Sequence, residues 1–146
     1  MTTSSAEFTL APQLAADTHL VGDFALARVL LMDDARFPWL ILVPRRAGMR
    51  EWIDLPRIEQ HLLLDEIERC ELALRTRLAP DKLNIAALGN VVAQLHVHLI
   101  ARSTTDVAWP RPVWGVGERV TYTADALSNR LAQLRADLVL CASTSA

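Results

Sequence analysis

Alternating polar and apolar residues in the segment Gln94–Ala101 constrain the fold more than any other feature of this sequence. The polar positions are Gln94, His96 and His98, and a leucine or valine stands between each pair. Successive side chains of a β-strand point to opposite faces, so this period of two predicts a strand with the three polar side chains in a row and the apolar ones in the core. Two imidazoles and a carboxamide on one rigid element make a candidate site.

Shorter apolar stretches, bounded by Gly, Asp or Pro, predict four more strands. They are His19–Val21, Phe24–Met32, Trp39–Val43 and Lys82–Leu88. A tight turn at Gly89-Asn90 would join the last of these to Gln94–Ala101. The spacing of these segments predicts successive antiparallel strands.

Apolar residues at spacings of three and four predict a long helix from the region of Asp54 to Leu78. Asp54 is the expected cap, with Pro56 in the first turn, and Pro80 stops the helix. Glu66 is among the charged residues available to its outer face. A final helix follows from the leucines at 127, 131, 134 and 138, with Thr123 or Asp125 near its start. The predicted fold class is α+β, with a five-stranded antiparallel sheet and helices on one of its faces.

Length and charge limit the functions that such a chain can have. A chain of 146 residues is about one domain. It has 15 Lys and Arg against 17 Asp and Glu, a formal net charge of -2. This balance gives no overall positive charge that would attract duplex nucleic acid or an anionic membrane surface. No apolar run is long enough to span a bilayer and no signal peptide is recognisable, so we expect a cytoplasmic protein with unpatterned tails at residues 1–7 and 141–146.

Two other interpretations of the histidines stay open at this stage. The polar row can be a sheet edge that meets solvent, or two histidines two residues apart can share a metal ion. Zinc would need a third ligand, and neither His19 nor His61 has a spacing that promises one. Cys70 and Cys141 lie far apart, which predicts reduced thiols with a packing role. We expect no metal and no cofactor.

Residues 89–102 resemble the signature of the histidine triad (HIT) superfamily. In that signature a glycine and a polar residue lead into His-φ-His-φ-His-φ-φ, where φ is apolar and the middle histidine is the nucleophile. The segment Gln94–Ile100 keeps every apolar position and the second and third histidines, and has Gln94 at the first place. Upstream, WLILVPRR is similar to the family's strand that ends in Val-x-Pro-Lys-Arg. Trp39 and Ala47 stand where the family often carries further histidines.

The resemblance implies a HIT-like domain over residues 8–115, with a C-terminal helical extension over 116–146, and a homodimer formed through the long helix and Lys82–Leu88. The Gln-Leu-His-Val-His form and the later Trp-Pro element are most similar to bacterial members regarded as dinucleoside polyphosphate hydrolases. The implied reaction is hydrolysis or transfer at the α-phosphorus of a nucleotide. The rival interpretation is a nucleotide-binding protein with little or no catalysis.

Site residues carried over from the family fall into two groups. The catalytic set is His96, His98 and Gln94, and the nucleotide-binding set is Asp33, Gly89, Asn90, Val91, Arg102 and Trp114. His96 would attack phosphorus, so its other ring nitrogen must donate to a fixed acceptor such as a backbone carbonyl. His98 and the backbone amides near Asn90 would stabilise the phosphoryl oxygens. Trp109 and Trp114 either wall a nucleotide pocket or pin an irregular segment to the sheet, and Trp39 is expected in the core.

Overall fold

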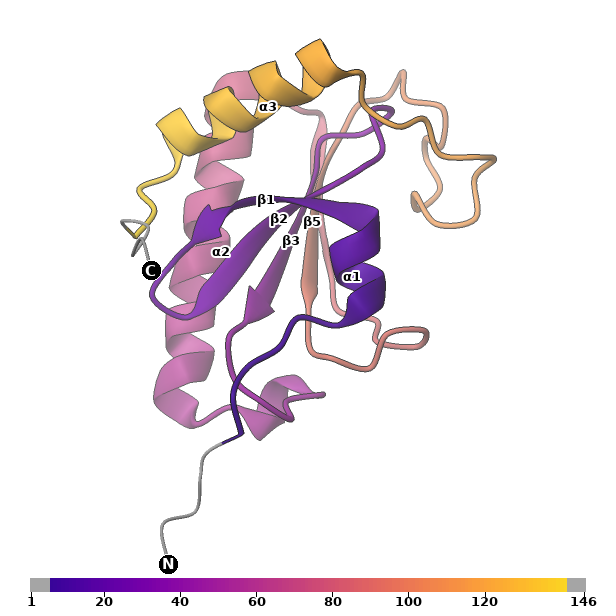
Figure 1. The fold of residues 1–146 in the computed structure, drawn as a ribbon. Coiled ribbons are helices and arrows are strands. Elements are labelled where there is room, and N and C mark those ends of the chain that lie inside the picture. The colour runs from indigo at the N-terminus through magenta and orange to yellow at the C-terminus, as the bar shows by residue number, and fades with distance from the viewer. Residues whose placement is uncertain (1–5, 142–146) are drawn as a thin grey trace, which may run out of the picture.

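In the described part of the chain, five antiparallel strands form one sheet in the order β1-β2-β3-β5-β4 (Figure 1). The structure, a computed structural model, describes residues 6–141. The strands are β1 (Thr18–Asp23), β2 (Ala27–Met32), β3 (Trp39–Pro44), β4 (Lys82–Ala86) and β5 (Val97–Arg102). Each neighbouring pair is antiparallel, which confirms the predicted fold class. β5 therefore lies between β3 and β4, and β4 is an edge strand.

Within residues 6–141, three α-helices and one short 3₁₀ helix accompany the sheet. They are α1 (Pro12–Asp17), η1 (Trp52–Asp54), α2 (Arg57–Leu78) and α3 (Ala124–Asp137). α2 and α3 confirm the two helices predicted from the apolar spacing. The hydroxyl of Thr123 accepts a hydrogen bond from the N–H of Ala126, as expected of a helix cap. α1 was not expected, because it is a single short Ala-rich segment without a side-chain cap.

The ends of α2 differ in part from the prediction. The helix begins at Arg57, directly after Pro56, and Asp54 does not cap it. The carboxylate of Asp54 instead accepts hydrogen bonds from the backbone N–H groups of Arg50 and Glu51, which closes η1. At the other end Ala79 adopts a left-handed φ of 43°, so the chain leaves the helix just before Pro80.

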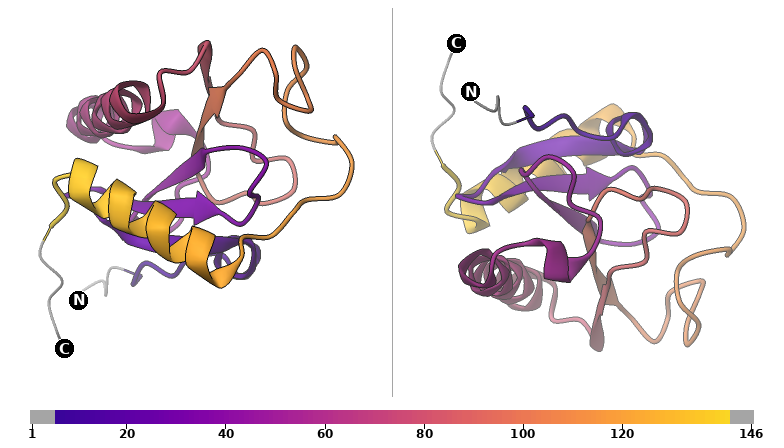
Figure 2. Two further views of the ribbon diagram at one scale, coloured as in Figure 1. Left: turned by 90° about the horizontal axis from the view of Figure 1, so that it is seen from above. Right: turned by 90° about the horizontal axis from the view of Figure 1, so that it is seen from below.

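Each face of the sheet has its own apolar core. One cluster joins the sheet to α2 and α3 through residues such as Leu63, Ile67 and Leu134. The other contains Leu14 of α1 and Val113 of the segment between β5 and α3. Figure 2 shows α2 and α3 on one side of the sheet and α1 on the other. The expectation of helices on one face therefore holds for α2 and α3 only.

The connection between β4 and β5 is longer than predicted. β4 ends at Ala86 and β5 begins at Val97, so residues 87–96 are a loop and not a tight turn at Gly89-Asn90. Leu95 explains the late start of β5, because its N–H donates to the carbonyl of Met49 at 3.0 Å rather than to a neighbouring strand. β2 also begins later than predicted, since the N–H of Phe24 bonds to the carbonyl of Ala27 in a turn.

Two side chains are placed differently from their sequence-based assignment. Glu66 is only 1% exposed, and its carboxylate accepts hydrogen bonds from the N–H groups of Leu26 and Ala27, each at 2.8 Å. Burial raises the pKa of Glu66. Cys70 packs in the core, where burial raises its pKa to about 12, but Cys141 is exposed and has no packing role.

Of the two predicted tails, residues 1–5 and 142–146 lie outside the described part of the chain. Within residues 6–141, no helix is both long and apolar enough to cross a bilayer.

Candidate functional site

His96 and His98 form a buried pair at the start of β5. Their rings lie 4.8 Å apart, centroid to centroid, and the residues are 6% and 5% exposed. Val97 and Leu99 pack toward α2, so alternation places His98 on the opposite face of the sheet. A polar sheet edge that meets solvent is thus the wrong interpretation of these histidines.

The orientation of His96 is set by the backbone two residues earlier. Its Nδ1 lies 2.6 Å from the carbonyl oxygen of Gln94. A carbonyl oxygen can only accept, so Nδ1 carries the proton, and in the neutral ring Nε2 keeps its lone pair. The prediction that a backbone carbonyl holds the second ring nitrogen of His96 is confirmed.

Trp39, which was predicted from the sequence to lie in the core, holds His98 in place. The indole Nε1 of Trp39 donates to Nδ1 of His98 at 3.0 Å. Trp39 is buried at 5% exposure, as expected, but its N–H group also makes it part of the site. Because Nδ1 accepts, the proton of neutral His98 resides on Nε2. Burial, and to a lesser extent the neighbouring His96, lower the pKa of His98 to about 4.

Trp114 completes an aromatic cluster around His98. Its ring packs edge-on against His98 at 5.1 Å and against Trp39 at 5.7 Å. Trp114 and Trp39 also line a hollow of about 180 Å³, together with Met32, Asp34, Arg36, Val113, Gly115, Val116, Gly117 and Arg119. We call this the tryptophan hollow. The structure therefore brings Trp114 to the histidines, whereas Trp109 stacks near the guanidinium of Arg102.

A second hollow, of about 220 Å³, opens beside His96. It is lined by Arg50, Glu51, Trp52, Ala87, Leu88, Gly89, Gln94, Leu95 and His96, and we call it the His96 hollow. Gly89 has a φ of 71°, which favours glycine, and the loop continues through Asn90 to Val91, which is 94% exposed. Of the predicted backbone cradle, Gly89 lines this hollow together with His96.

Arg50 is the basic side chain of the His96 hollow, and sequence reasoning missed it. No ion pair or hydrogen bond from its guanidinium to any residue in 6–141 is present, so its charge is available to an anion. Arg50 follows Gly48 and Met49 in an irregular segment after β3. No periodic pattern could have indicated its position.

Arg102 is not available to a ligand, contrary to the sequence-based assignment. It is 2% exposed and forms a two-point ion pair with Asp106, at 2.8 and 3.0 Å. Its remaining hydrogen bonds go to the side-chain oxygen of Asn84 and to the carbonyl of Arg111. The guanidinium ties the segment after β5 to the edge of the sheet.

Asp33, expected at the ribose, lines neither hollow. Its carboxylate accepts a hydrogen bond from the N–H of Tyr122 at 3.0 Å and lies 3.3 Å from Nε2 of His19. The next residue, Asp34, does line the tryptophan hollow, where it is paired with Arg36 at 2.7 Å. The Arg36 guanidinium helps to hold the pKa of Asp34 below its usual range, against the opposing effect of burial.

The side chain of Gln94 bonds to the N-terminal segment of the chain. Its carboxamide Nε2 donates to the carbonyl of Thr9, and its Oε1 accepts from the N–H of Ala11. The predicted strand is shorter than expected, because β5 begins at Val97 and leaves Gln94 and His96 in the preceding loop. Gln94 contributes its backbone carbonyl to His96 and its side chain to the N-terminal segment.

The described residues offer little to a metal ion. Residues 6–141 contain no group of three His, Cys, Asp or Glu side chains arranged to hold one. Nδ1 of each histidine already has a protein partner, at Gln94 and at Trp39.

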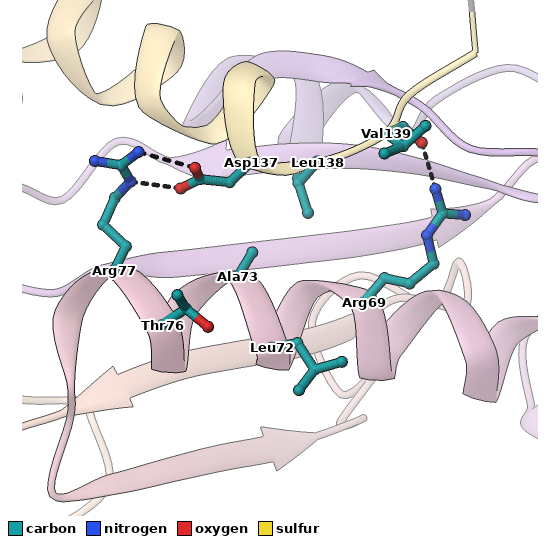
Figure 3. Close-up of a pocket in the computed structure, with 8 residues that line it drawn as sticks. All are labelled: Arg69, Leu72, Ala73, Thr76, Arg77, Asp137, Leu138 and Val139. Atoms are coloured by element: carbon teal, nitrogen blue, oxygen red, sulfur yellow. Dashed lines mark hydrogen bonds and ion pairs between the residues drawn. The ribbon is translucent and has the colours of Figure 1, made fainter.

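A larger hollow, of about 650 Å³, lies between α2 and α3 and away from the histidines (Figure 3). Its two arginines are engaged with the end of α3. Arg77 pairs with Asp137, and Arg69 donates to the carbonyl of Val139. Figure 3 shows Leu72 and Ala73 on α2 between these two contacts, so the hollow belongs to the packing of α3 on α2.

Comparison with known proteins gives a consistent result. Residues 13–105 match the family model described as the HIT domain. A histidine triad protein of Bradyrhizobium japonicum is 48% identical, with a TM-score of 0.88 over 90% of this chain and 98% of that one. A histidine triad protein of Marinobacter aquaeolei VT8 is 45% identical, with a TM-score of 0.89 over 91% and 97%. One of Sinorhizobium meliloti 1021 is 40% identical, with a TM-score of 0.87 over 90% and 97%. No curated protein matches the chain.

Proposed function

The chain belongs to the HIT domain family, and from this premise we propose that it hydrolyses or transfers a nucleotidyl group at the α-phosphorus of a nucleotide conjugate, such as a dinucleoside polyphosphate. The observation that carries the proposal is the hydrogen bond between Nδ1 of His96 and the carbonyl of Gln94. It leaves Nε2 of His96 with a lone pair, as a nucleophile requires.

The reaction divides into two displacements. Nε2 of His96 forms a bond to the α-phosphorus while the bond from phosphorus to the leaving group breaks. The resulting nucleotidyl-histidine is then attacked by water, which gives the nucleoside monophosphate, or by another acceptor, which gives a transfer product. Most of the rate acceleration in each displacement comes from positioning the reacting groups and from stabilising the charge on the phosphoryl oxygens.

His98 acts as a neutral hydrogen-bond donor in this scheme. Trp39 occupies its Nδ1, so the Nε2–H group is the one that can donate to a phosphoryl oxygen. Gly89 lines the same hollow as His96, so backbone N–H groups of the loop from Gly89 are proposed to bind the phosphoryl oxygens, and Arg50 supplies positive charge in that hollow.

The same geometry favours anhydride substrates over phosphoramidates. Neither neighbour of His96 supplies a proton readily, because the amide of Gln94 does not titrate and the pKa of His98 is about 4. A phosphate oxygen leaves without added protonation, whereas an amine leaves only after it gains a proton. We therefore infer that the leaving group is a phosphate or a nucleoside phosphate.

A substrate panel tests the proposal. Purified protein is incubated, in the absence of metal, with diadenosine polyphosphates and with an adenosine phosphoramidate, and the release of AMP is followed by chromatography. Turnover of the polyphosphates well above that of the phosphoramidate is the expected result. Binding without turnover of either class would favour the rival function, a nucleotide-binding protein without useful catalysis.

We further propose a homodimer formed through α2 and β4. β4 is an edge strand, and apolar side chains are exposed on α2 (Leu64 at 57%), on β4 (Ile85 at 48%) and in the loop after β4 (Leu88 at 50%). Such a surface is typical of a protein–protein contact.

Residues 8–115 would form the HIT-like domain, and residues 116–146 would form its helical extension. A cytoplasmic location remains a prediction from the sequence.

A further inference from the structure

The side chain of Gln94 holds an N-terminal segment of the chain against the site. This segment, Phe8–Ala11, is called the strap here. Nε2 of Gln94 donates to the carbonyl of Thr9 at 2.9 Å, and Oε1 accepts from the N–H of Ala11 at 2.8 Å. In a parallel β-sheet, the N–H and C=O groups of one residue bond to the two residues that flank its partner on the adjacent strand. The carboxamide of Gln94 makes this pair of bonds to Thr9 and Ala11, which flank Leu10. The carboxamide thus serves as a peptide group beside Leu10.

Packing places the strap on the histidine side of the sheet. Phe8 and Leu10 pack against the second core cluster, as does Val92 of the loop before the histidines. The guanidinium of Arg28 lies 5.7 Å from the centre of the Phe8 ring. The strap is therefore anchored at both of its apolar side chains and at the amide of Gln94.

Gln94 also contacts the nucleophile through its other end. Its backbone carbonyl accepts the 2.6 Å hydrogen bond from Nδ1 of His96. No main-chain strand bond holds Gln94 itself, because β5 begins only at Val97. The peptide group that carries this carbonyl is held at its N–H end, where Leu95 donates to the carbonyl of Met49 at 3.0 Å. On the Gln94 side, the side-chain bonds to Thr9 and Ala11 supply the other anchor.

We propose that Gln94 is a positioning residue that couples the strap to the orientation of His96. This proposal rests on the proposed function, in which Nε2 of His96 must face phosphorus. A carboxamide suits the task because its donor and acceptor lie side by side. The two nitrogens of an imidazole point in diverging directions, so a histidine at position 94 could not bond to both Thr9 and Ala11.

Two substitutions break the same contact from opposite sides. Gln94→Leu removes both side-chain bonds. Ala11→Pro removes only the N–H that Gln94 accepts, and Ala11 already has a φ of −54°, which proline adopts without strain. Gln13→Leu and Ala6→Pro are the matched controls, since they make the same exchanges outside the contact.

Three measurements are made on each variant. Hydrogen exchange reports whether the strap amides are protected, ¹⁵N chemical shifts of the His96 ring report its tautomer, and steady-state kinetics separate kcat from KM. We expect Ala11→Pro and Gln94→Leu to lose strap protection and to convert His96 from one tautomer to a mixture. In both, kcat falls by roughly tenfold to a hundredfold. The double variant falls no further than the worse single one, and Gln94→His falls with them.

The proposal is overturned if Ala11→Pro loses strap protection while the His96 tautomer stays as in the wild type, because the strap would then not reach the nucleophile. It is also overturned if the losses in the two single variants simply add. The tautomer measurement needs no substrate. If the wild-type protein turned over no nucleotide, the proposed function would be refuted. The ¹⁵N chemical shifts of the His96 ring would still show whether the strap is coupled to the orientation of His96.

Discussion

Nε1 of Trp39 donates a hydrogen bond to Nδ1 of His98 across a distance of 3.0 Å. The two residues lie on adjacent strands, β3 and β5, and both are buried. An indole nitrogen can only donate, so this contact selects the tautomer of His98 in which Nε2 carries the proton. In the proposed function, Trp39 thus orients the N–H group of His98 that would donate to the phosphate.

Trp39→Phe keeps an aromatic ring, removes the N–H group and reduces the volume of the buried side chain. His98 then exchanges between tautomers, and kcat for a diadenosine polyphosphate falls on the order of tenfold. The free energy of unfolding falls by about 1 kcal/mol for the lost hydrogen bond, and further for the cavity that the smaller ring leaves. Steady-state kinetics and urea denaturation check both values. A kcat equal to that of the wild type would show that the tautomer of His98 does not matter.

The depressed pKa of His98, about 4 instead of 6.5, makes stability depend on pH. The unfolded chain binds a proton at this residue more readily than the folded protein does. The contribution of neutral His98 to the free energy of unfolding is therefore fully present above pH 6.5 and is lost as the pH falls toward 4. Between pH 7 and 5 we expect the wild type to lose about 2 kcal/mol more than His98→Gln, by urea denaturation at each pH. Equal losses in the two proteins would contradict the shift.

Glu66 stabilises the turn before β2 by accepting two backbone hydrogen bonds. Glu66→Leu leaves the N–H groups of Leu26 and Ala27 buried without partners, so the free energy of unfolding falls by about 2 to 5 kcal/mol. Glu68→Leu is the control on the exposed face of the same helix, where a change within about 0.5 kcal/mol is expected. Similar effects of the two substitutions would mean that the buried carboxylate is not important.

A substitution at Arg102 distinguishes a structural role of this arginine from a role in nucleotide binding. Arg102→Met leaves Asp106 buried without its partner and lowers the free energy of unfolding by about 3 kcal/mol or more. KM for the nucleotide changes little, because the guanidinium is fully engaged within the protein. Arg75→Met, on the exposed side of α2, is the control. A large rise in KM without loss of stability would restore Arg102 to the nucleotide site.

Patterns that repeat along the chain could be predicted from the sequence, and contacts between distant segments could not. The apolar spacing predicted α2 and α3, the apolar run Trp39–Val43 predicted β3, and alternation predicted β5. The period of two also predicted a side-chain row through Gln94, but the strap captures that carboxamide through residues more than eighty positions away. Glu66 was assigned to the outer face because a charge is usually exposed, and only the turn before β2 supplies the two N–H groups that allow its burial.

At the site, the family motif located the proposed nucleophile but not its surroundings. His96 and its carbonyl partner followed from the motif and the chemistry of imidazole. The indole of Trp39 and the guanidinium of Arg50 come from β3 and from the irregular segment after it, and neither position carries a local signal. Asp33 was assigned to the ribose, but its carboxylate bonds to the N–H of Tyr122, whereas the adjacent Asp34 lines the tryptophan hollow.

The most direct test of the proposed function is detection of a covalent adduct on His96. Wild-type protein and His96→Ala are mixed with a diadenosine polyphosphate and quenched in alkali, where a phosphorus–nitrogen bond on histidine survives, and intact masses are recorded. We predict one adenylyl group on the wild type, located at residue 96 by peptide mapping, and neither adduct nor turnover for the folded His96→Ala variant. Near-normal turnover by His96→Ala would contradict the assignment of the nucleophile.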